Sequence, residues 1–268
     1  EFGNSFLGTG NTLISANCLL GLQGHDPLWN KEHVHLYQEP IPDHTYLMTV
    51  DVARGRGQDY STFSVFDVTE RPFKQVGIYR DNMISPLLFP DIIERYGKLY
   101  NEALVIVENN DQGQIVCNAL HYDLEYPNVF TQSSVKASGI GVTMTRKVKQ
   151  IGCSTLKELM EENKLRVIDK FTIGELITFV GKGKSYEADG GQHDDLVMNL
   201  VMFSWFITTP YFQSLTDLEL KKMLYDEQQQ MIDDDMVPFG IIDDGTDNPE
   251  SYTQGGDIWT VVGDVDIY

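Results

Sequence analysis

The chain has 268 residues, of which 41% are apolar and 11% aromatic, so it can bury a sizeable core and is not globally disordered. Its net charge of −20 excludes a protein that holds nucleic acid by bulk electrostatic attraction. No apolar run reaches the roughly 18–20 residues that span a bilayer, and the first residues lack the order of a signal peptide. We therefore expect no membrane contact and a cytoplasmic location.

The chain ends and the cysteines add three further expectations. The sequence does not begin with Met, so we expect a piece of a longer protein. Cys18, Cys117 and Cys153 are far apart and lack C-x-x-C spacing, which predicts reduced core residues and neither a zinc site nor a disulfide framework. Residues 211–268 carry 14 Asp or Glu against two Lys, so −12 of the net charge lies in this segment.

The first predicted elements are three strands that follow a loop-like start. Residues 1–44 are rich in Gly, Asn, Pro and His, and we interpret them as a lead-in segment packed on, or linking to, another domain. Residues 45–53 form an apolar strand, and residues 61–69 alternate apolar and polar side chains, which predicts a strand with one buried face. A third strand is predicted at 71–81, and the short links between the three predict an antiparallel meander.

Helices and strands alternate after the meander. Residues 85–101 have the apolar spacing of a helix, with Pro90 in its first turn. Residues 103–109 form a short, wholly apolar strand that ends in an acid, which is typical of a strand covered on both faces. The remaining predicted elements are a helix at 113–124, a strand at 128–133, a helix at 145–164, a short edge strand at 165–168, a helix at 172–180, a Gly/Lys loop or small hairpin at 181–192 and a helix at 194–207.

This order of elements predicts an α/β fold. A three-strand meander that leads through a helix to a buried parallel strand is the ribonuclease H-like (RuvC/integrase-like) topology, in which a mixed central sheet has helices on both faces. We assign this domain to residues 45–210 and treat residues 211–268 as an acidic C-terminal extension.

Acidic side chains occur at three equivalent places in this topology. Asp51 lies in the first strand, Glu108 ends the apolar fourth strand, and the pair Asp194 and Asp195 opens the last apolar helix. Since the first and fourth strands are parallel neighbours, their acids are expected side by side at one sheet edge, where the helix adds a third. Grouped carboxylates repel one another unless cations lie among them, and hard oxygen ligands select Mg²⁺ or Mn²⁺. Two such ions about 3.5–4 Å apart activate a water and stabilise the leaving oxygen of a phosphodiester.

Each acid also has a purely structural explanation. Asp51 could pair with Arg54 or Arg56, and Glu108 could be a solvated residue at the end of a strand. An Asp of the 194–195 pair could cap the helix, although one cap needs only one side chain. The joint placement of the acids on separate core elements favours the metal site.

The chain resembles a known family in four stretches: "TVDVARGRGQDYSTFSVFDV", "VIVENN", "IGCSTLKELMEENKL" and "HDDLVMNLVMFSW". Residues 1–210 are similar to the C-terminal nuclease domain of the large terminase subunit of tailed bacteriophages, the DNA-packaging motor, and most similar to its myovirus type. The resemblance implies a metal-dependent endonuclease that cuts concatemeric double-stranded genomic DNA. It also implies Mg²⁺ or Mn²⁺ as cofactor, with two ions, and a location in the host cell cytoplasm without retention in the mature virion.

The same resemblance implies residue roles and partners. The catalytic, metal-binding triad of the family maps to Asp51, Glu108 and Asp195, with Asp59 and Asp194 as accessory acids that also bind metal. The implied partners are double-stranded DNA, an N-terminal ATPase domain of the full-length protein, the portal and the small terminase subunit.

A Gly/Lys segment resembles a phosphate-binding loop only superficially. In "GKGKS" (181–185) the first glycine of the ATP-binding pattern is replaced by Thr178, and no buried strand precedes the segment. We therefore expect no ATPase site in this chain. Lys182 and Lys184 stand shortly before the paired aspartates and are expected to hold a DNA backbone.

Further basic residues are candidates for DNA contact. Arg54 and Arg56 follow Asp51 closely and are expected to touch DNA. We interpret His193 as a helix-start residue rather than a metal ligand. A second candidate patch, for which a solvated helix start is an equal alternative, consists of Arg146, Lys147 and Lys149.

Two other functions stay open at this point. The same fold and acids would serve a Holliday-junction resolvase or an exonuclease, and a substrate panel would separate these from an endonuclease. A non-catalytic acidic module that docks on other parts of a packaging motor would scatter its charge rather than place acids at the ends of apolar strands. Residues 211–268 are expected either to be a solubilising extension or to dock on a basic surface such as the portal.

Overall fold

The computed structural model divides the chain into two units, Glu1–Gln213 and Ser214–Tyr268. In the second unit, β12 (Ser251–Gln254) and β13 (Asp257–Thr260) pair as an antiparallel hairpin. Most of the predicted acidic extension lies outside the described residues, so its role stays a prediction. The structure describes residues 11–134, 137–183, 185–215, 251–254 and 257–260. No helix in these ranges is long and apolar enough to cross a membrane.

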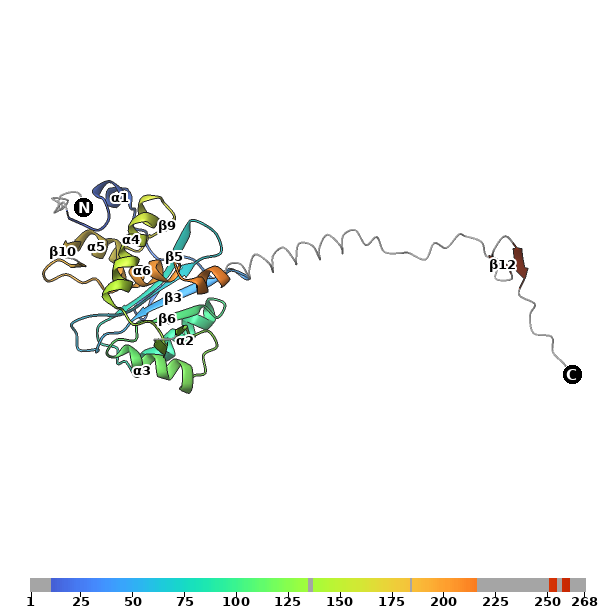
Figure 1. Ribbon diagram of the computed structural model, residues 1–268, viewed down its shortest axis with the longest axis horizontal. Coiled ribbons are helices and arrows are strands. Elements are labelled where there is room, and N and C mark those ends of the chain that lie inside the picture. The colour runs from blue at the N-terminus through green and yellow to red at the C-terminus, as the bar shows by residue number, and fades with distance from the viewer. Residues whose placement is uncertain (1–10, 135–136, 184, 216–250, 255–256, 261–268) are drawn as a thin grey trace. The chain divides into compact units, whose positions relative to one another are not determined.

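The first unit is built on a mixed sheet whose centre is the predicted meander (Figure 1). Strands β3 (Tyr46–Asp51), β4 (Ser61–Asp67) and β5 (Phe73–Asp81) pair antiparallel in succession. Strand β6 (Leu104–Val107) then pairs parallel to β3. The short β9 (Leu165–Arg166) lies beside β5, where an edge strand was predicted. This arrangement confirms the ribonuclease H-like topology predicted from the order of elements.

The sheet extends further than the sequence predicted, because part of the expected lead-in segment joins it. Strands β1 (Trp29–Lys31) and β2 (Val34–Leu36) form a hairpin that adds to the sheet beside β5, giving the order β1-β2-β5-β4-β3-β6. The turn uses Glu32 and His33, both with positive φ (52° and 67°). Such two-residue turns are normally signalled by Asn or Gly, so the sequence gave no indication of this one.

Helices cover both faces of the sheet, as predicted (Figure 1). Helix α2 (Phe89–Leu99) and helix α3 (Gly113–Asn118), which continues as a π-helical turn (Ala119–Asp123), pack on one face. Helices α4 (Arg146–Glu161), α5 (Lys170–Thr178) and α6 (Asp195–Phe206) lie on the other side of the sheet. Helix α1 (Ala16–Gly21) and two further hairpins, β7 (Thr131–Ser134) with β8 (Ala137–Ile140) and β10 (Phe179–Lys182) with β11 (Ser185–Ala188), complete the first unit.

Strand β4 is buried on both faces, although its alternating sequence predicted only one buried face. Its polar side chains are accommodated by hydrogen bonds rather than by solvent. Ser64 accepts a bond from Gln75 Nε2 (3.3 Å), which also donates to Thr172 Oγ1 of α5 (3.2 Å). The alternation of apolar and polar residues therefore reflects a strand whose polar face is also buried, with its side chains hydrogen-bonded inside the protein.

Helix α6 passes through the interior of the unit. All of its residues from Leu196 to Phe206 are buried, which is the pattern of a helix packed on every side. Thr49 Oγ1 donates to Asn199 O (3.1 Å), and Asn199 Nδ2 donates to Thr62 Oγ1 (2.8 Å), so buried polar bonds tie the helix to β3 and β4. The start of α6 is thereby fixed relative to the strands that carry the other predicted acids.

Helix α4 approaches α6 so closely that one position requires glycine. A Cβ atom on Gly152 would stand 2.3 Å from Val201 O and 2.8 Å from Val201 Cγ1. On the outer surface of α5, by contrast, a Cβ on Gly174 would meet nothing within 4 Å. The two glycines are thus a matched pair of helix-interior positions with opposite surroundings.

We predict that Gly152→Ala lowers the free energy of unfolding by about 1–3 kcal/mol, because the helices must move apart to admit the methyl group. Gly174→Ala is the control, and it should raise the free energy of unfolding by roughly 0.5–1 kcal/mol through the better helix propensity of Ala. Urea unfolding of both variants measures this difference. Equal effects of the two substitutions would contradict the close α4–α6 approach.

Candidate metal centre

Two of the predicted acids stand side by side where parallel strands end. Asp51 is the last residue of β3, and Glu108 directly follows β6. The strands are in register with Val50 opposite Val107, and the backbone N–H of Glu108 donates to Val50 O (2.9 Å). The pairing of β3 with β6 therefore places both carboxylates at the same edge of the sheet, as the topology predicted.

Asp195 reaches this edge from α6. Thr62 lies opposite Asp51 in the β3–β4 pair, and its hydroxyl donates to the backbone carbonyl of Asp195 (3.3 Å). The carboxylate of Asp195 accepts a bond from the backbone N–H of Tyr60 (3.3 Å) and lies 3.6 Å from His193 Nδ1. Asp195 is thus held against the strand that neighbours Asp51, and its side chain is only 12% exposed.

Asp51 and Asp195 line a polar cavity of about 410 Å³ at the sheet edge. Asp59 and Asp194, the two predicted accessory acids, line it together with Asp51 and Asp195. Glu108 is not among the lining residues, although its strand position puts it beside Asp51. The structure therefore brings together four of the five predicted acids in one cavity, and the fifth, Glu108, stands beside Asp51 on the neighbouring strand.

The electrostatics of the cluster are those of like charges held together. Burial raises the pKa of the Asp51 carboxyl well above its usual range, and the nearby charges of Glu108, Asp195 and Asp194 raise it further. Burial also raises the pKa of Asp195 to about 6, against the bond from Tyr60 N–H. The pKa of Glu108 is raised by burial, although the amide of Asn110 (2.8 Å from Glu108 Oε1) favours its charged form.

This donor set fits a hard divalent cation. Every acid that lines the cavity offers only oxygen, which Mg²⁺ and Mn²⁺ prefer, and a cation would reverse the repulsion that raises these pKa values. Among the described residues, no group of three or more His, Cys, Asp or Glu side chains is placed so that it could hold a metal ion as it stands. Since Mg²⁺ keeps several waters and uses only one or two protein carboxylates, a closed set is not required.

The paired aspartates do not act as helix caps. Asp194 occupies the N-cap position of α6, yet its side chain makes no capping bond to the helix. Its carboxylate instead accepts from the backbone N–H of Ala188 in β11 (3.3 Å). The first free N–H groups of α6, those of Leu196 and Val197, are bound by Glu175 of α5. The structure thus frees both aspartates from the capping role considered above.

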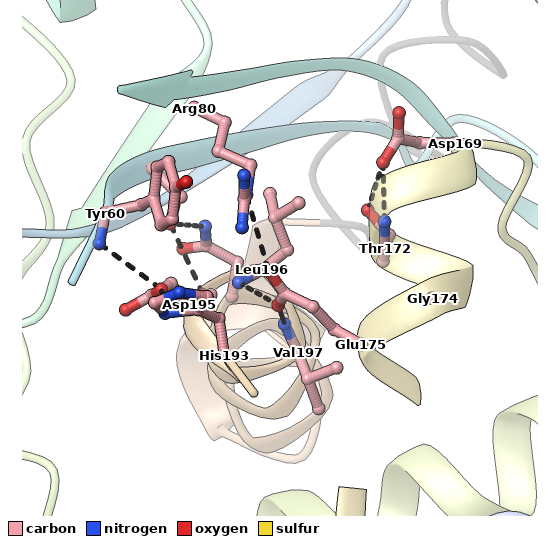
Figure 2. A network of polar contacts seen from close by, with 12 residues as sticks. Tyr60, Arg80, Asp169, Thr172, Gly174, Glu175, His193, Asp195, Leu196 and Val197 are labelled. Atoms are coloured by element: carbon pink, nitrogen blue, oxygen red, sulfur yellow. Dashed lines mark hydrogen bonds and ion pairs between the residues drawn. The ribbon is translucent and has the colours of Figure 1, made fainter. Parts of the chain in front are cut away.

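Glu175 and its neighbour Arg80 were not predicted from the sequence. Burial raises the pKa of Glu175 to about 7, with a further contribution from the charge of Asp195. Arg80 Nε lies 3.5 Å from Glu175 Oε1 (Figure 2). One signal was present, because Glu175 is the only acid within the apolar segment "TIGELITFV". No local pattern indicated Arg80, which occupies the end of β5.

The predicted DNA-contacting arginines lie at the cavity. Arg54 and Arg56 both line it and are exposed. Arg54 Nε pairs with Asp111 Oδ2 (2.8 Å) rather than with Asp51, so the alternative of an Asp51–Arg54 pair is not seen. Both guanidinium groups are therefore accessible at the rim of the acidic cluster.

The predicted lysines are more scattered. Lys182 is exposed on the β10–β11 hairpin, where its amine donates to Ala188 O (2.8 Å) and lies 3.3 Å from Glu187. Lys184 lies outside the described residues. Of the helix-start patch, Lys149 acts on the site, because its charge lowers the pKa of Glu108. The other two members of that patch, exposed in the first turn of α4, are Arg146 and Lys147.

Comparison with known proteins agrees with this geometry. The large terminase subunit of Thermus virus P23-45 is 29% identical over 211 residues, which are 75% of this chain and 39% of that protein. The chain therefore spans about two fifths of the length of such relatives. The large terminase nuclease domain of Thermus phage P74-26 is 26% identical with a TM-score of 0.55, and the match covers 72% of this chain and 93% of that domain.

A further solved relative supports the fold. The large terminase nuclease of thermophilic phage G20c with bound magnesium has a TM-score of 0.59 at 24% identity, over 72% of this chain and 96% of that one. The G20c nuclease has also been solved with cobalt and with zinc. Residues 48–204, more than half of the chain and all of the candidate centre, match the family model of the terminase RNaseH-like domain. The chain is therefore a member of the terminase ribonuclease H-like domain family.

Proposed function

We propose that this chain is the metal-dependent DNA endonuclease of a viral packaging terminase, which cuts concatemeric double-stranded genomic DNA by two-metal phosphodiester hydrolysis. The convergence of Asp51, Glu108 and Asp195 from three separate elements carries the proposal. The solved relatives are nucleases, and one binds magnesium. Mg²⁺ or Mn²⁺ is the proposed cofactor, with two ions.

The three acids take different positions in this proposal. Asp51 is flanked by Glu108, which follows β6, and by Asp195 of α6, so Asp51 and Asp195 would share or bridge ions and Glu108 would complete the ligand set. Asp59 and Asp194 add negative charge at the cavity and are proposed as accessory ligands. When bound, the ions would supply an activated water and stabilise the leaving oxygen of the phosphodiester.

The DNA backbone would approach the cavity along its basic rim. Arg54 and Arg56 stand beside the acids and offer guanidinium groups that match phosphate oxygens. Local basic residues of this kind are needed because the net charge of the chain is −20. Secondary contacts are proposed for Lys182 of the β10–β11 hairpin and for Lys184. They are also proposed for the start of α4, which holds Arg146, Lys147 and Lys149.

The wider context is also proposed rather than observed. The relatives are whole large terminase subunits, so we propose an N-terminal ATPase domain in the same protein, with the portal and the small subunit as partners. The location proposed is the host cell cytoplasm, without retention in the mature virion. The extension from residue 211 is proposed to solubilise the protein or to dock on the portal.

Two alternatives make different substrate predictions. An exonuclease requires a DNA end, and a resolvase requires a branched junction. A purely docking module would scatter its acids over the surface, whereas Asp51 ends β3 and Glu108 directly follows the parallel β6 beside it. We therefore favour a catalytic role and test it with closed circular DNA.

The first prediction concerns cleavage. Purified protein should nick and linearise closed circular plasmid in Mg²⁺ or Mn²⁺ and not in EDTA. Asp51→Asn, Glu108→Gln and Asp195→Asn should each lower the rate more than about 100-fold, since even residues that support metal ligands are worth roughly 10–100-fold. Asp91→Asn, on the exposed start of α2, is the control. Cleavage only of linear or of branched DNA would instead favour the exonuclease or the resolvase.

The second prediction concerns pH and metal. The folded-state pKa of Asp195 is raised to about 6, so its ionisation opposes folding as pH rises through the window from about 4 to 6. In EDTA, Asp195→Asn should therefore be more stable than wild type at pH 8, by about 1–3 kcal/mol, and no more stable at pH 4. Urea unfolding at the two pH values measures this difference.

The same two proteins test whether Asp195 binds metal. Excess Mn²⁺ should raise the melting temperature of the wild type, because an ion that binds only the folded state stabilises that state by mass action. The increase should be much smaller for Asp195→Asn. Equal increases would remove Asp195 from the metal site.

The third prediction concerns DNA binding. In EDTA, Arg54→Ala and Arg56→Ala should each weaken DNA binding. Each should also reduce the steepness of log affinity against log salt concentration by about 1, the change expected for the loss of one phosphate contact. The joint change of Lys182 and Lys184 to Ala should act in the same direction. Lys98→Ala, which breaks an exposed pair on α2, is the control. An unchanged salt slope would show that the altered residues do not touch phosphate.

A further inference from the structure

The N-terminus of α6 is bound by a side chain from another helix. Glu175 Oε2 accepts bonds from the backbone N–H groups of Leu196 (2.8 Å) and Val197 (3.2 Å). The side chain of Glu175 is only 7% exposed. Since Asp194 makes no capping bond, Glu175 supplies the buried acceptor that the first turn of α6 needs. It acts on the two residues that directly follow Asp195.

The second oxygen of Glu175 faces a partly buried cation. Arg80 Nε lies 3.5 Å from Glu175 Oε1, and the Arg80 side chain is 17% exposed. The Arg80 guanidinium lies over the ring of Tyr60, 3.4 Å from its centre, and 5.3 Å from the centre of the Phe171 ring. This guanidinium is therefore held by aromatic surfaces as well as by charge.

Arg80 and Glu175 thus reach Asp195 by two routes (Figure 2). Through Glu175 they hold the first turn of α6. The second route runs through Tyr60, the residue before β4. The Arg80 guanidinium packs on its ring, and its backbone N–H donates to Asp195 Oδ2 (3.3 Å). His193 packs edge-on against the same Tyr60 ring, with ring centres 4.9 Å apart. Both the backbone and the carboxylate of Asp195 are therefore set by contacts that originate at one ion pair.

We propose that Glu175 and Arg80 are positioning residues that hold the Asp195 carboxylate in the orientation needed to bind a divalent cation. This inference rests on the proposed role of Asp195. The pairing with Arg80 has a physical purpose, because an unpaired carboxylate at this place would add a further negative charge to the acidic cluster. As a pair, the two residues provide the acceptor for α6 without adding net charge beside Asp195.

A merely structural cap elsewhere in the fold provides a matched control. Asp169 caps α5 through Thr172, with Oδ2 2.6 Å from the backbone N–H, and it is fully buried like Glu175. It also accepts a bond from Tyr37 Oη (2.6 Å). Within the part of the chain that the structure describes, the hydrogen bonds of the Asp169 carboxylate go to Thr172 and Tyr37 rather than to Asp195 or α6, and Figure 2 shows those to Thr172. Its loss should therefore reduce stability and leave the metal site unchanged.

The test measures the Mn²⁺ concentration that raises the melting temperature by a fixed amount above its value in EDTA, because the increase grows with the logarithm of the ion concentration and has no maximum. Glu175→Ala should raise this concentration about 10-fold or more, as expected for residues that orient a metal ligand. Glu175→Gln keeps an acceptor for α6 and should stay within a few-fold of wild type. Asp169→Ala should melt at a lower temperature in EDTA and keep the wild-type Mn²⁺ dependence. In plasmid cleavage, Glu175→Ala should lower kcat and leave KM for DNA unchanged.

Several outcomes would overturn the proposal. A wild-type Mn²⁺ dependence in Glu175→Ala, or an equal shift in Asp169→Ala, would reduce Glu175 to an ordinary cap. If Glu175→Ala does not fold, Arg80→Gln and Glu175→Gln provide the test instead. The proposal then predicts that Arg80→Gln needs more Mn²⁺ than the wild type and that Glu175→Gln does not. Asp195→Asn is measured in parallel. A wild type without any Mn²⁺ response would overturn the metal centre itself, whereas a response that only Asp195→Asn loses would overturn the positioning role alone.

Discussion

The central constraint in this fold is that carboxylates which repel one another are held together by rigid neighbours. The parallel pairing of β3 and β6 places Asp51 and Glu108 side by side. The burial of α6 on every side does the same for Asp195. Burial raises the pKa values of all three acids, and the charges of neighbouring carboxylates raise them further. The packing of the sheet and of α6 must offset the unfavourable free energy of charging these groups. A cation is the component that relieves this arrangement.

The sequence was sufficient for the parts of the fold that have a local pattern. Apolar runs predicted β3 and β6, alternation of apolar and polar residues predicted β4, and short links joined β3, β4 and β5 into a meander. Helical spacing predicted α2 and α4. Asp51, Glu108 and the pair before α6 were identifiable because each acid interrupts or ends an apolar segment that must be buried. Topology then brought them together, since parallel neighbours end at the same edge of a sheet.

The parts that the sequence did not reveal depend on contacts between distant segments. The turn of the β1–β2 hairpin uses Glu32 and His33 instead of Asn or Gly, so nothing local announced it. Arg80 and Glu175 lie 95 residues apart in numbering and gain their meaning only when β5 and α5 meet beside α6. The polar face of β4 looked solvated because its hydrogen-bond partners are equally remote. Which predicted acid bonds to which neighbour likewise required coordinates.

The complete enclosure of α6 also determines how the site can open. A helix with a solvent face can fray or swing outward while the rest of a domain stays folded, whereas a helix covered along its whole length cannot separate without dismantling the layers around it. Amide groups of α6 should therefore exchange with solvent only through the largest unfolding event of the first unit. The orientation of Asp195 is accordingly protected by the cooperativity of the whole domain, and adjustment at the centre has to come from the exposed loop that carries Arg54, Arg56 and Asp59.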